Sequence, residues 1–278
     1  MRIEQEFKFT DKDFKYLKNL VAEEAGIILS DAKRSMVYCR LAKRLRSLSL
    51  HEFSAYCNIL KQDDRNEMVN FVNAITTNLT SFFREKHHFN FLANTLIPYW
   101  KRTKNDTRRI RIWSAGCSTG EEAYSIAITL LDNFPDLKSW DVKILATDLD
   151  TNVVSKAKEG VYDTERMEGF PSAMLERWFL KSKNSKVNKV KVSPCLQELI
   201  TFKQLNLHHD WPFNGSFDLI FCRNVVIYFN KETQRVLADR YADCLVDNGH
   251  LFLGHSESLF NVSDRFESEG NTVYKKTM

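Results

Sequence analysis

Small side chains followed by two acids form the stretch of this 278-residue sequence with the clearest chemical meaning. Positions 114–120 read Ser-Ala-Gly-Cys-Ser-Thr-Gly, and Glu121 and Glu122 follow at once. Small residues let backbone amides approach a ligand closely, and a helix starting there directs its own amides towards the ligand. The two glutamates would repel a pyrophosphate, and neither G-x-G-x-x-G nor G-x-x-x-x-G-K-[ST] occurs here. We therefore expect a nucleotide-type cofactor without phosphate, held through its hydroxyls or amines.

A further acid lies where such a cofactor fold needs one. Asp148 lies near the end of the apolar stretch 142–149, just before Asp150 and Thr151. A carboxylate at the tip of the second strand commonly binds ribose hydroxyls in these folds. Either aspartate could instead only cap the following helix. Because Asp148 is nearer the strand end, we assign the ribose to Asp148 and the cap to Asp150 or Thr151.

Apolar patterns predict the elements that position these residues. The stretch 110–113 alternates as a strand does, and a helical spacing follows at Ala123, Ile126, Ala127, Leu130, Leu131 and Phe134. A strand over 142–149 and a helix over 151–160 repeat the unit. The two βα units predict an α/β fold that binds its ligand at the carboxyl ends of the strands.

The βα pattern breaks at 161–199, which we interpret as an inserted, β-like segment containing Val187, Val190 and Val192. Strands are predicted again at 200–207, 217–222 and 251–254, with a hairpin over 266–275 turning at Gly270-Asn271. A helix is predicted over 231–246, and its inward residues should be Val236, Leu237, Tyr241, Cys244 and Leu245.

Residues 1–80 have a different pattern and predict a small bundle of four amphipathic helices. Their apolar stripes are Phe14, Leu17, Leu20 and Val21; Val37, Leu41, Leu45 and Leu48; Phe53, Tyr56, Cys57 and Leu60; and Met68, Val72, Ile75 and Leu79. The second helix has six cations and no acid after Asp31: Lys33, Arg34, Arg40, Lys43, Arg44 and Arg46. This helix is either an ordinary solvated face or a surface that docks an acidic partner.

Composition excludes several classes of protein. Hydrophobic residues make up 43% of the chain and charged residues 27%, as in ordinary globular proteins. No apolar run is long enough to cross a bilayer, and the charged start does not resemble a secretory signal, so we expect a cytoplasmic protein. The six cysteines lack a C-x-x-C pair and should be buried reduced thiols. Neither His87-His88 nor His208-His209 has ligand spacing for one helical face, so no metal is expected.

Five motifs, in this order and over most of the chain, resemble the CheR family of chemotaxis receptor glutamate O-methyltransferases. They are TTNLTSFFRE (76–85), SAGCSTGEEAYSIAI (114–128), ATDLDTNVVSKAKEGVY (146–162), FDLIFCRNVVIYF (217–229) and GHSESLF (254–260). The resemblance implies a Rossmann-like class I methyltransferase domain over 81–278 with a small β-subdomain at 161–199. An all-α domain over 1–80 would dock the receptor.

The resemblance further implies S-adenosylmethionine as methyl donor and S-adenosylhomocysteine as product. The acceptors would be glutamates on the cytoplasmic helical domains of membrane chemoreceptors, the methyl-accepting chemotaxis proteins. Residues implied to line the donor site are Asn78, Thr80, Arg84, Glu122, Asp148, Asn206, Leu207, Arg223 and Asn224. Arg84 and Tyr228 would lie nearest the transferred methyl. Members that tether to a receptor's C-terminal pentapeptide have a glycine-rich turn that 181–191 lacks, so such a tether is not expected.

Charge alone limits the chemistry of such a reaction. A glutamate with a pKa near ~4.3 is already ionised at neutral pH, so no general base is required. Arg84 would orient the carboxylate, and the Tyr228 hydroxyl would hold its second oxygen. Two other classes stay open: a methyltransferase of nucleic acid that uses the basic helix, and a module that senses S-adenosylmethionine without turnover. The low net charge of +4 and the absence of an N-P-P-[YF] motif count against the first.

Overall fold

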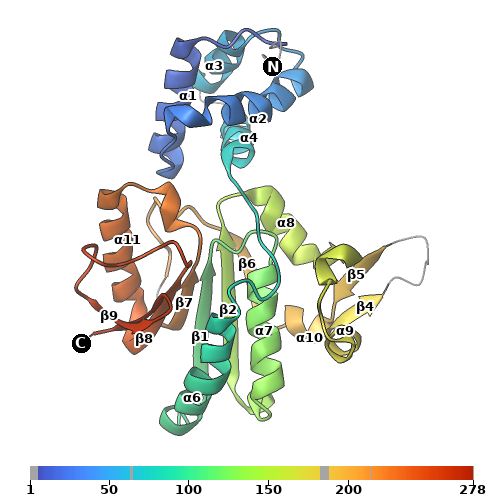
Figure 1. Cartoon of the computed structure of the whole chain (residues 1–278), viewed down its shortest axis with the longest axis vertical. Helices are drawn as coiled ribbons and strands as arrows, with labels where there is room; N and C mark the ends of the chain where they lie inside the picture. The colour runs from blue at the N-terminus through green and yellow to red at the C-terminus, as the bar shows by residue number, and fades with distance from the viewer. Residues whose placement is uncertain (1–5, 63–64, 182–187, 214, 278) are drawn as a thin grey trace.

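The computed structural model describes residues 6–62, 65–181, 188–213 and 215–277, which form a helical bundle above an α/β part (Figure 1). The last helix of the bundle ends at Ile75, and the next helix begins at His87. The segment 76–86 between them, called the linker below, runs from the bundle across the top of the sheet.

The bundle consists of the predicted amphipathic helices, whose stripes pack into one apolar core. The helices are α1 Asp11–Ala25, α2 Arg34–Ser47, α3 Phe53–Lys61 and α4 Arg65–Ile75, with a 3-10 turn η1 at Asp31–Lys33. Thr10 and Asp13 form a capping box at the start of α1, and Gly26, with φ 69°, ends the helix in the left-handed conformation.

Leu79 was wrongly predicted to lie on the fourth apolar stripe. Its side chain is 82% exposed, because α4 ends four residues earlier. The Arg40 guanidinium donates to the carbonyls of Ile75 and Thr76, where a further helical turn would have supplied backbone donors. The Arg40 side chain of α2 thus takes the place of the next turn of α4, and the chain continues as the linker.

The basic face predicted on α2 is largely neutralised within the bundle. Arg34, Arg44 and Arg46 form ion pairs with Asp11, Glu67 and Glu6, which lie on other segments. Arg40 is committed to the end of α4. Among the residues that the structure describes, only the Lys33 and Lys43 side chains of this group have no ion pair or hydrogen bond.

A seven-stranded sheet forms the centre of the α/β part, in the order β6-β2-β1-β7-β8-β10-β9. Strands β6 to β8 of this order run parallel, and β10 and β9 are antiparallel. The strands are β1 Arg109–Ala115, β2 Asp141–Asp148, β6 Ile200–Gln204, β7 Phe217–Cys222, β8 Leu245–Leu253, β9 Phe266–Gly270 and β10 Val273–Lys276. From β1 the chain builds outward to β2 and β6 and then returns to β7 on the other side. This reversal is the switch point where open sheets bind ligands.

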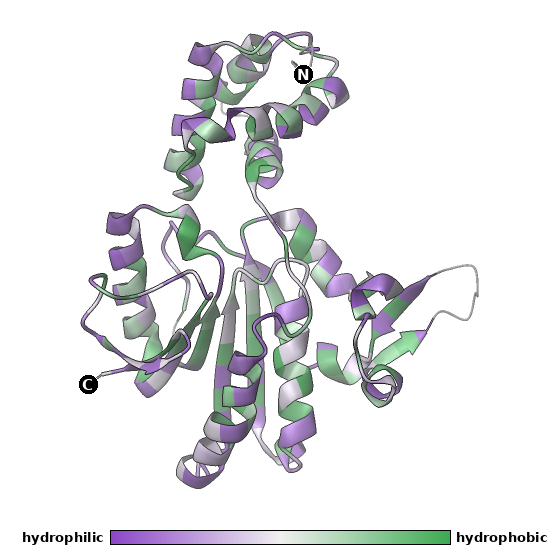
Figure 2. Ribbon diagram, viewed as in Figure 1, coloured by the Kyte–Doolittle hydropathy of each residue, from purple (hydrophilic) through white to green (hydrophobic). Residues whose placement is uncertain are grey.

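Side chains alternate across the sheet and bury both faces, so the strands are mostly apolar in Figure 2. Ile112 packs with the core beneath α7 (Glu121–Asn133), whereas Trp113 packs with the core beneath α11 (Lys231–Cys244). The first face is also covered by α5 His87–Phe91, the π-helical turn η2 Leu92–Leu96, α6 Ile97–Thr103 and α8 Thr151–Glu159. A short turn, η3 Leu137–Ser139, precedes β2. The predicted α/β class is confirmed.

The inserted segment forms a separate antiparallel sheet in the order β3-β5-β4, beside the main sheet in Figure 1. Its elements are β3 Val161–Asp163, η4 Thr164–Met167, α9 Ser172–Trp178, β4 Phe179–Lys181, β5 Lys189–Val192 and α10 Pro194–Gln197. Val190 and Val192 lie on strand β5, as the β-like pattern predicted, and both are buried. Val187 and most of the turn at 181–191 lie outside the described residues.

Two predictions near α11 need correction. Val236 was expected to point inward but is 53% exposed, because the buried face is centred on Leu237, Ala238, Tyr241 and Ala242. The helix was also predicted to continue to 246. It ends at Cys244, since Leu245 already pairs with Phe217 of the neighbouring strand, and β8 is correspondingly longer than the predicted strand at 251–254.

All six cysteines are free thiols, but burial was predicted correctly for only part of them. Cys57, Cys117 and Cys222 are buried, whereas Cys39 and Cys195 are exposed. Within the described ranges, no helix has the length and apolar character needed to span a bilayer.

Candidate active site

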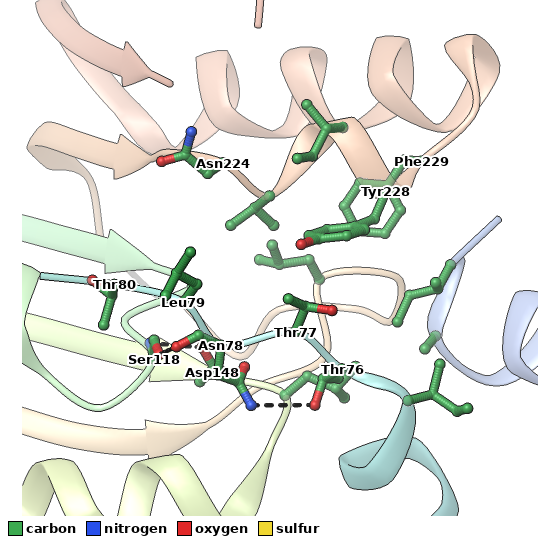
Figure 3. A pocket seen from close by; sticks show the side chains of 18 of the residues that line it. Thr76, Thr77, Asn78, Leu79, Thr80, Ser118, Asp148, Asn224, Tyr228 and Phe229 are labelled. Carbon is green, nitrogen blue, oxygen red and sulfur yellow. Dashed lines mark hydrogen bonds between the residues drawn. The ribbon is translucent and has the colours of Figure 1, made fainter. Parts of the chain in front are cut away.

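A cavity of about 470 Å³ lies at the carboxyl ends of the parallel strands, below the helical bundle. Its floor is formed by the segments that follow β1, β2, β6 and β7, and the linker forms another wall. The remaining wall belongs to the bundle, through residues 25–30 and the start of α2. Figure 3 shows Tyr228 on one side of this space and Asn78 and Asp148 on the other.

The small-residue turn after β1 lets backbone form the floor. Gly116 has φ 101°, and a Cβ atom there would lie 2.4 Å from Cγ2 of Val225. Glycine is therefore required at this position by conformation and by space. The N–H groups of Gly116 and Cys117 both donate to the Thr147 carbonyl at 2.8 Å, which fastens this turn to the end of β2.

Asp150 caps helix α8, one of the two caps that the sequence predicted, and Asp148 has different contacts. Asp150 Oδ1 accepts the Asn152 N–H at 2.8 Å and so caps α8, while Oδ2 accepts the Asn78 side-chain amide at 2.7 Å. Asp148 accepts the N–H groups of Ser118 at 2.8 Å and Asp150 at 3.0 Å and lines the cavity. Burial raises the pKa of Asp148 to about 6, although these backbone donors lower it.

Glu121 and Glu122 are adjacent in sequence but face different surroundings. Glu121 is fully buried, accepts the Thr119 hydroxyl and pairs with Arg166 of the inserted subdomain. Glu122 lines the cavity, where its carboxylate accepts the Ser114 hydroxyl at 2.7 Å and the Arg223 guanidinium at 3.2 Å. Burial raises the pKa of Glu122, and the charge of Arg223 opposes this rise.

The linker presents Arg84 to the cavity in an unusual backbone conformation. Phe83 and Glu85 on either side of Arg84 both have positive φ, 52° and 57°. Such values are uncommon in residues other than glycine and persist where surrounding contacts impose them. The Phe83 N–H donates to the Ser125 hydroxyl at 2.9 Å, and Arg223 donates to the Arg84 carbonyl. Arg84 itself donates to the Leu79 carbonyl at 3.0 Å.

Tyr228 lies on the opposite wall, at the end of the short 3-10 helix η5 Val226–Tyr228. Its ring is half-buried and packs partly against the core of the helical bundle, and its hydroxyl points into the cavity (Figure 3). The Tyr228 carbonyl accepts the Ile28 N–H at 2.9 Å. Tyr228 therefore joins the bundle to the sheet as well as lining the site.

Asn206 also joins the two parts of the chain. Its amide group donates to the Glu24 carbonyl at 2.7 Å, and its amide oxygen accepts the His208 N–H at 3.0 Å. Both polar groups of this cavity-lining side chain thus already have protein partners. Leu207 beside it is buried, and its side chain belongs to the core under α11.

All the residues predicted for the site line this one cavity. They are Asn78, Thr80, Arg84, Glu122, Asp148, Asn206, Leu207, Arg223, Asn224 and Tyr228. Sequence reasoning missed the wall from the bundle, which includes Ile27, Ile28, Leu29, Ser30 and Met36. No motif pointed to these residues, because they reach the site only through the packing of two domains.

Glu257 is a second omission, although it lies within the motif GHSESLF. Its buried carboxylate accepts three backbone N–H groups: Gly254 at 2.6 Å, Asn224 at 2.8 Å and Ile227 at 3.2 Å. Asn224 has φ 59°, so the chain turns sharply there. Glu257 therefore holds the turn between Arg223 and Tyr228 in place. The sequence contained this acid in a motif but did not reveal its role.

Glu85, His87 and His88 bring one potential metal-ligand atom each within 4.8 Å of one another. Glu85 Oε2 lies 3.2 Å from the Arg223 guanidinium, which would repel an added cation. We therefore interpret this group as part of an ion-pair network.

The fold and the cavity together define a class of protein. A parallel sheet with small residues and carboxylates at its central strand ends, and without a phosphate-binding loop, is the architecture of class I S-adenosylmethionine-dependent methyltransferases. The cavity fits this ligand in its chemistry: Gly116 allows close backbone approach, Asp148 can accept from hydroxyls, and Glu122 can pair with an ammonium group.

Comparison with known proteins identifies the family within this class. Residues 78–275 match the family model "CheR methyltransferase, SAM binding domain", and residues 12–76 match "CheR methyltransferase, all-alpha domain". The chain is 44% identical over 273 residues to "Chemotaxis protein methyltransferase 2" of Pseudomonas aeruginosa, covering 97% of this chain and 95% of the relative. It is 39% identical over 277 residues to "Chemotaxis protein methyltransferase" of Escherichia coli K12, covering 99% and 94%.

The chain therefore belongs to the CheR methyltransferase family. It is an S-adenosylmethionine-dependent methyltransferase that acts in chemotaxis, and the resemblance read from the five motifs is confirmed.

Proposed function

We propose that this enzyme methylates glutamate side-chain carboxylates on the cytoplasmic helical domains of membrane chemoreceptors, and that it works in the cytoplasm. The observation that carries this proposal is the meeting of Arg84 and Tyr228 with Asp148 and Glu122 around one cavity. A cation and a phenol hydroxyl suit an anionic acceptor, while the two carboxylates suit a cationic donor. The names of the relatives in Pseudomonas aeruginosa and Escherichia coli support a chemotaxis protein as acceptor.

Two carboxylates that line the cavity hold the donor. Asp148 accepts from the ribose hydroxyls, and Glu122 pairs with the ammonium of the methionine part. The other residues proposed to line the donor are Asn78, Thr80, Arg84, Asn206, Leu207, Arg223 and Asn224. When bound, S-adenosylmethionine supplies an electrophilic methyl group on a positively charged sulfur.

The protein's own task is then to position the acceptor carboxylate. Glutamate is ionised at neutral pH, so no residue has to remove a proton. Arg84 orients one carboxylate oxygen by charge-assisted hydrogen bonds, and the Tyr228 hydroxyl donates to the other. Excessive stabilisation of the bound carboxylate by Arg84 would lower its nucleophilicity, so the main contribution of Arg84 is orientation.

The helical bundle supplies the docking surface for the receptor. Because Arg34, Arg40, Arg44 and Arg46 are engaged inside the bundle, the attraction for an acidic partner falls to Lys33 and Lys43. Lys33 is exposed and also lines the cavity, so it is placed to attract an acceptor glutamate towards the site.

The direct test offers donor carrying a labelled methyl group together with a receptor cytoplasmic fragment, RNA and DNA in parallel reactions. The proposal expects label on the receptor fragment alone. Label on RNA or DNA would favour a nucleic-acid methyltransferase, and binding without transfer to any acceptor would indicate a sensing module. Either result would reject the proposal.

A further inference from the structure

The Arg223 guanidinium lines the cavity and lies between two carboxylates. Its Nη1 is 3.2 Å from Glu122 Oε2, and its Nη2 is 3.2 Å from Glu85 Oε2. The side chains are 2%, 11% and 10% exposed for Arg223, Glu122 and Glu85, so the trio is shielded from solvent. Glu122 lines the cavity, whereas Glu85 lies behind Arg223 on the linker.

Two carboxylates share the single positive charge of Arg223 in this trio. Burial raises the pKa of Glu85, but the hydrogen bond from His255 and the charge of Arg223 lower it to about 2, so this carboxylate is ionised. His88 Nδ1 lies 3.7 Å from Glu85 Oε2, and burial together with Arg223 lowers the pKa of His88 to about 3, so His88 is neutral. The ionised Glu85 carboxylate therefore pairs with Arg223 through one oxygen, and the His255 ring contacts its other oxygen at 2.8 Å.

We propose that Glu85 is a positioning residue that binds one edge of Arg223 and so leaves Glu122 free to bind the ammonium group of the donor. This inference rests on the proposed placement of the ammonium at Glu122. Without the charge of Glu85, Arg223 has Glu122 as its one remaining counter-ion in the trio. The bound ammonium would then compete with Arg223 for Glu122 and give the buried group a net positive charge.

Contacts from two other segments hold Glu85 in this place. Its Oε1 accepts the His255 ring N–H at 2.8 Å and the Asn224 amide at 3.4 Å. Its backbone has φ 57°, a conformation that these contacts help to impose. Arg223 also donates to the neighbouring Arg84 carbonyl, so the guanidinium that Glu85 orients contacts the backbone of Arg84 as well.

The experiment measures binding by calorimetry with two ligands that differ in the ammonium. S-adenosylhomocysteine has the amino-acid part, and 5′-methylthioadenosine keeps adenosine and the thioether but lacks it. Glu85→Gln keeps the size of the side chain and removes its charge. Affinity for S-adenosylhomocysteine should fall about tenfold or more, as for a lost charge-assisted contact, while affinity for methylthioadenosine should stay within about twofold.

Decarboxylated S-adenosylhomocysteine keeps the ammonium without the carboxylate and should lose affinity in Glu85→Gln as well. Glu121→Gln is the matched control, since Glu121 is a buried carboxylate one residue from Glu122 but pairs with Arg166 outside the cavity. It should leave the ratio of the two affinities unchanged, even where it lowers the melting temperature.

An unchanged affinity ratio in Glu85→Gln, or an equal loss for both ligands, would overturn the role of Glu85. The variant Glu122→Gln separates this failure from failure of the placement on which the role depends. If Glu122→Gln also keeps the wild-type ratio, the ammonium does not bind at Glu122, and the proposed arrangement of the donor is wrong. If Glu122→Gln changes the ratio and Glu85→Gln does not, the inference about Glu85 alone fails.

Discussion

The Glu257 carboxylate accepts the backbone N–H of Asn224 at 2.8 Å and thereby anchors the turn that leads from the end of β7 to Tyr228. It also accepts the N–H groups of Gly254 and Ile227, and burial raises the pKa of this acid. A buried acid from the loop after β8 is thus part of the support of the active site.

Replacing Glu257 with alanine should lower the free energy of unfolding by about 3 kcal/mol, because three backbone donors, one buried and two partly buried, lose their acceptor. Chemical denaturation of Glu257→Ala measures this loss, with the exposed Glu267→Ala as control. A loss no larger than in the control would show that the turn does not depend on Glu257.

The pKa of Asp148 predicts opposite effects of pH on stability and on donor binding. Burial raises this pKa from 3.8 to about 6, so the folded protein holds the proton more tightly than the unfolded chain does. The stability from this group is complete below the unfolded value and is lost as pH rises through about 6. In the proposed donor site the ionised Asp148 carboxylate binds the ribose hydroxyls, so affinity for S-adenosylhomocysteine should fall as pH drops below about 6.

The variant Asp148→Asn isolates this effect. It should bind S-adenosylhomocysteine about tenfold or more weakly at neutral pH, because charge-assisted hydrogen bonds are lost. Its affinity should also respond less to pH between about 5 and 7 than that of the wild type. Calorimetry across this range that gives parallel curves for both proteins would remove Asp148 from the ribose site.

Removal of the Tyr228 hydroxyl should affect turnover and spare donor binding. In Tyr228→Phe we expect kcat to fall by about 10- to 100-fold, the range for one hydrogen bond to a charged group. The dissociation constant for S-adenosylhomocysteine should not change, because the proposed partner of the deleted hydroxyl is the acceptor and not the donor. Wild-type turnover in this variant would reject a role of the hydroxyl in catalysis, and Tyr228 would then serve only in packing between the bundle and the sheet.

The ion pairs of α2 predict that its arginines stabilise the bundle, whereas Lys33 and Lys43 act in receptor docking. Arg44→Ala should lower stability by about 1–3 kcal/mol, since Arg44 donates twice to the Glu67 carboxylate, which is 6% exposed. Lys33→Glu combined with Lys43→Glu should leave the melting temperature almost unchanged. This double variant should instead slow receptor methylation at low salt, where long-range attraction is least screened. A normal rate there would show that α2 is an ordinary solvated face.

Local patterns were sufficient to predict the elements that build the site. The alternation at β1, the small residues after it and the spacing of α7 all lie within one continuous stretch, so short-range rules predict them correctly. The positions of Arg84 and Tyr228 required whole motifs, because neither residue has a local pattern that differs from an ordinary surface or core residue.

Predictions failed where long-range contacts decide the outcome. Arg34, Arg44 and Arg46 looked unpaired because their acids lie 23 to 40 residues away in the chain. Leu79 fitted the helical spacing of α4, but the helix ends at Ile75, where Arg40 of another helix binds the free carbonyl. The roles of Glu85 and Glu257 likewise depend on partners at Arg223 and Asn224, far from both in sequence.

The chemical stability of the transferred methyl group tests the central claim most directly. A methyl ester of glutamate is hydrolysed by mild alkali and releases volatile methanol, whereas methyl groups on nitrogen or on an ether oxygen are retained. A receptor cytoplasmic fragment labelled by this enzyme should lose its label as methanol on mild alkaline treatment. Label that stays on the protein after this treatment would contradict transfer to a carboxylate.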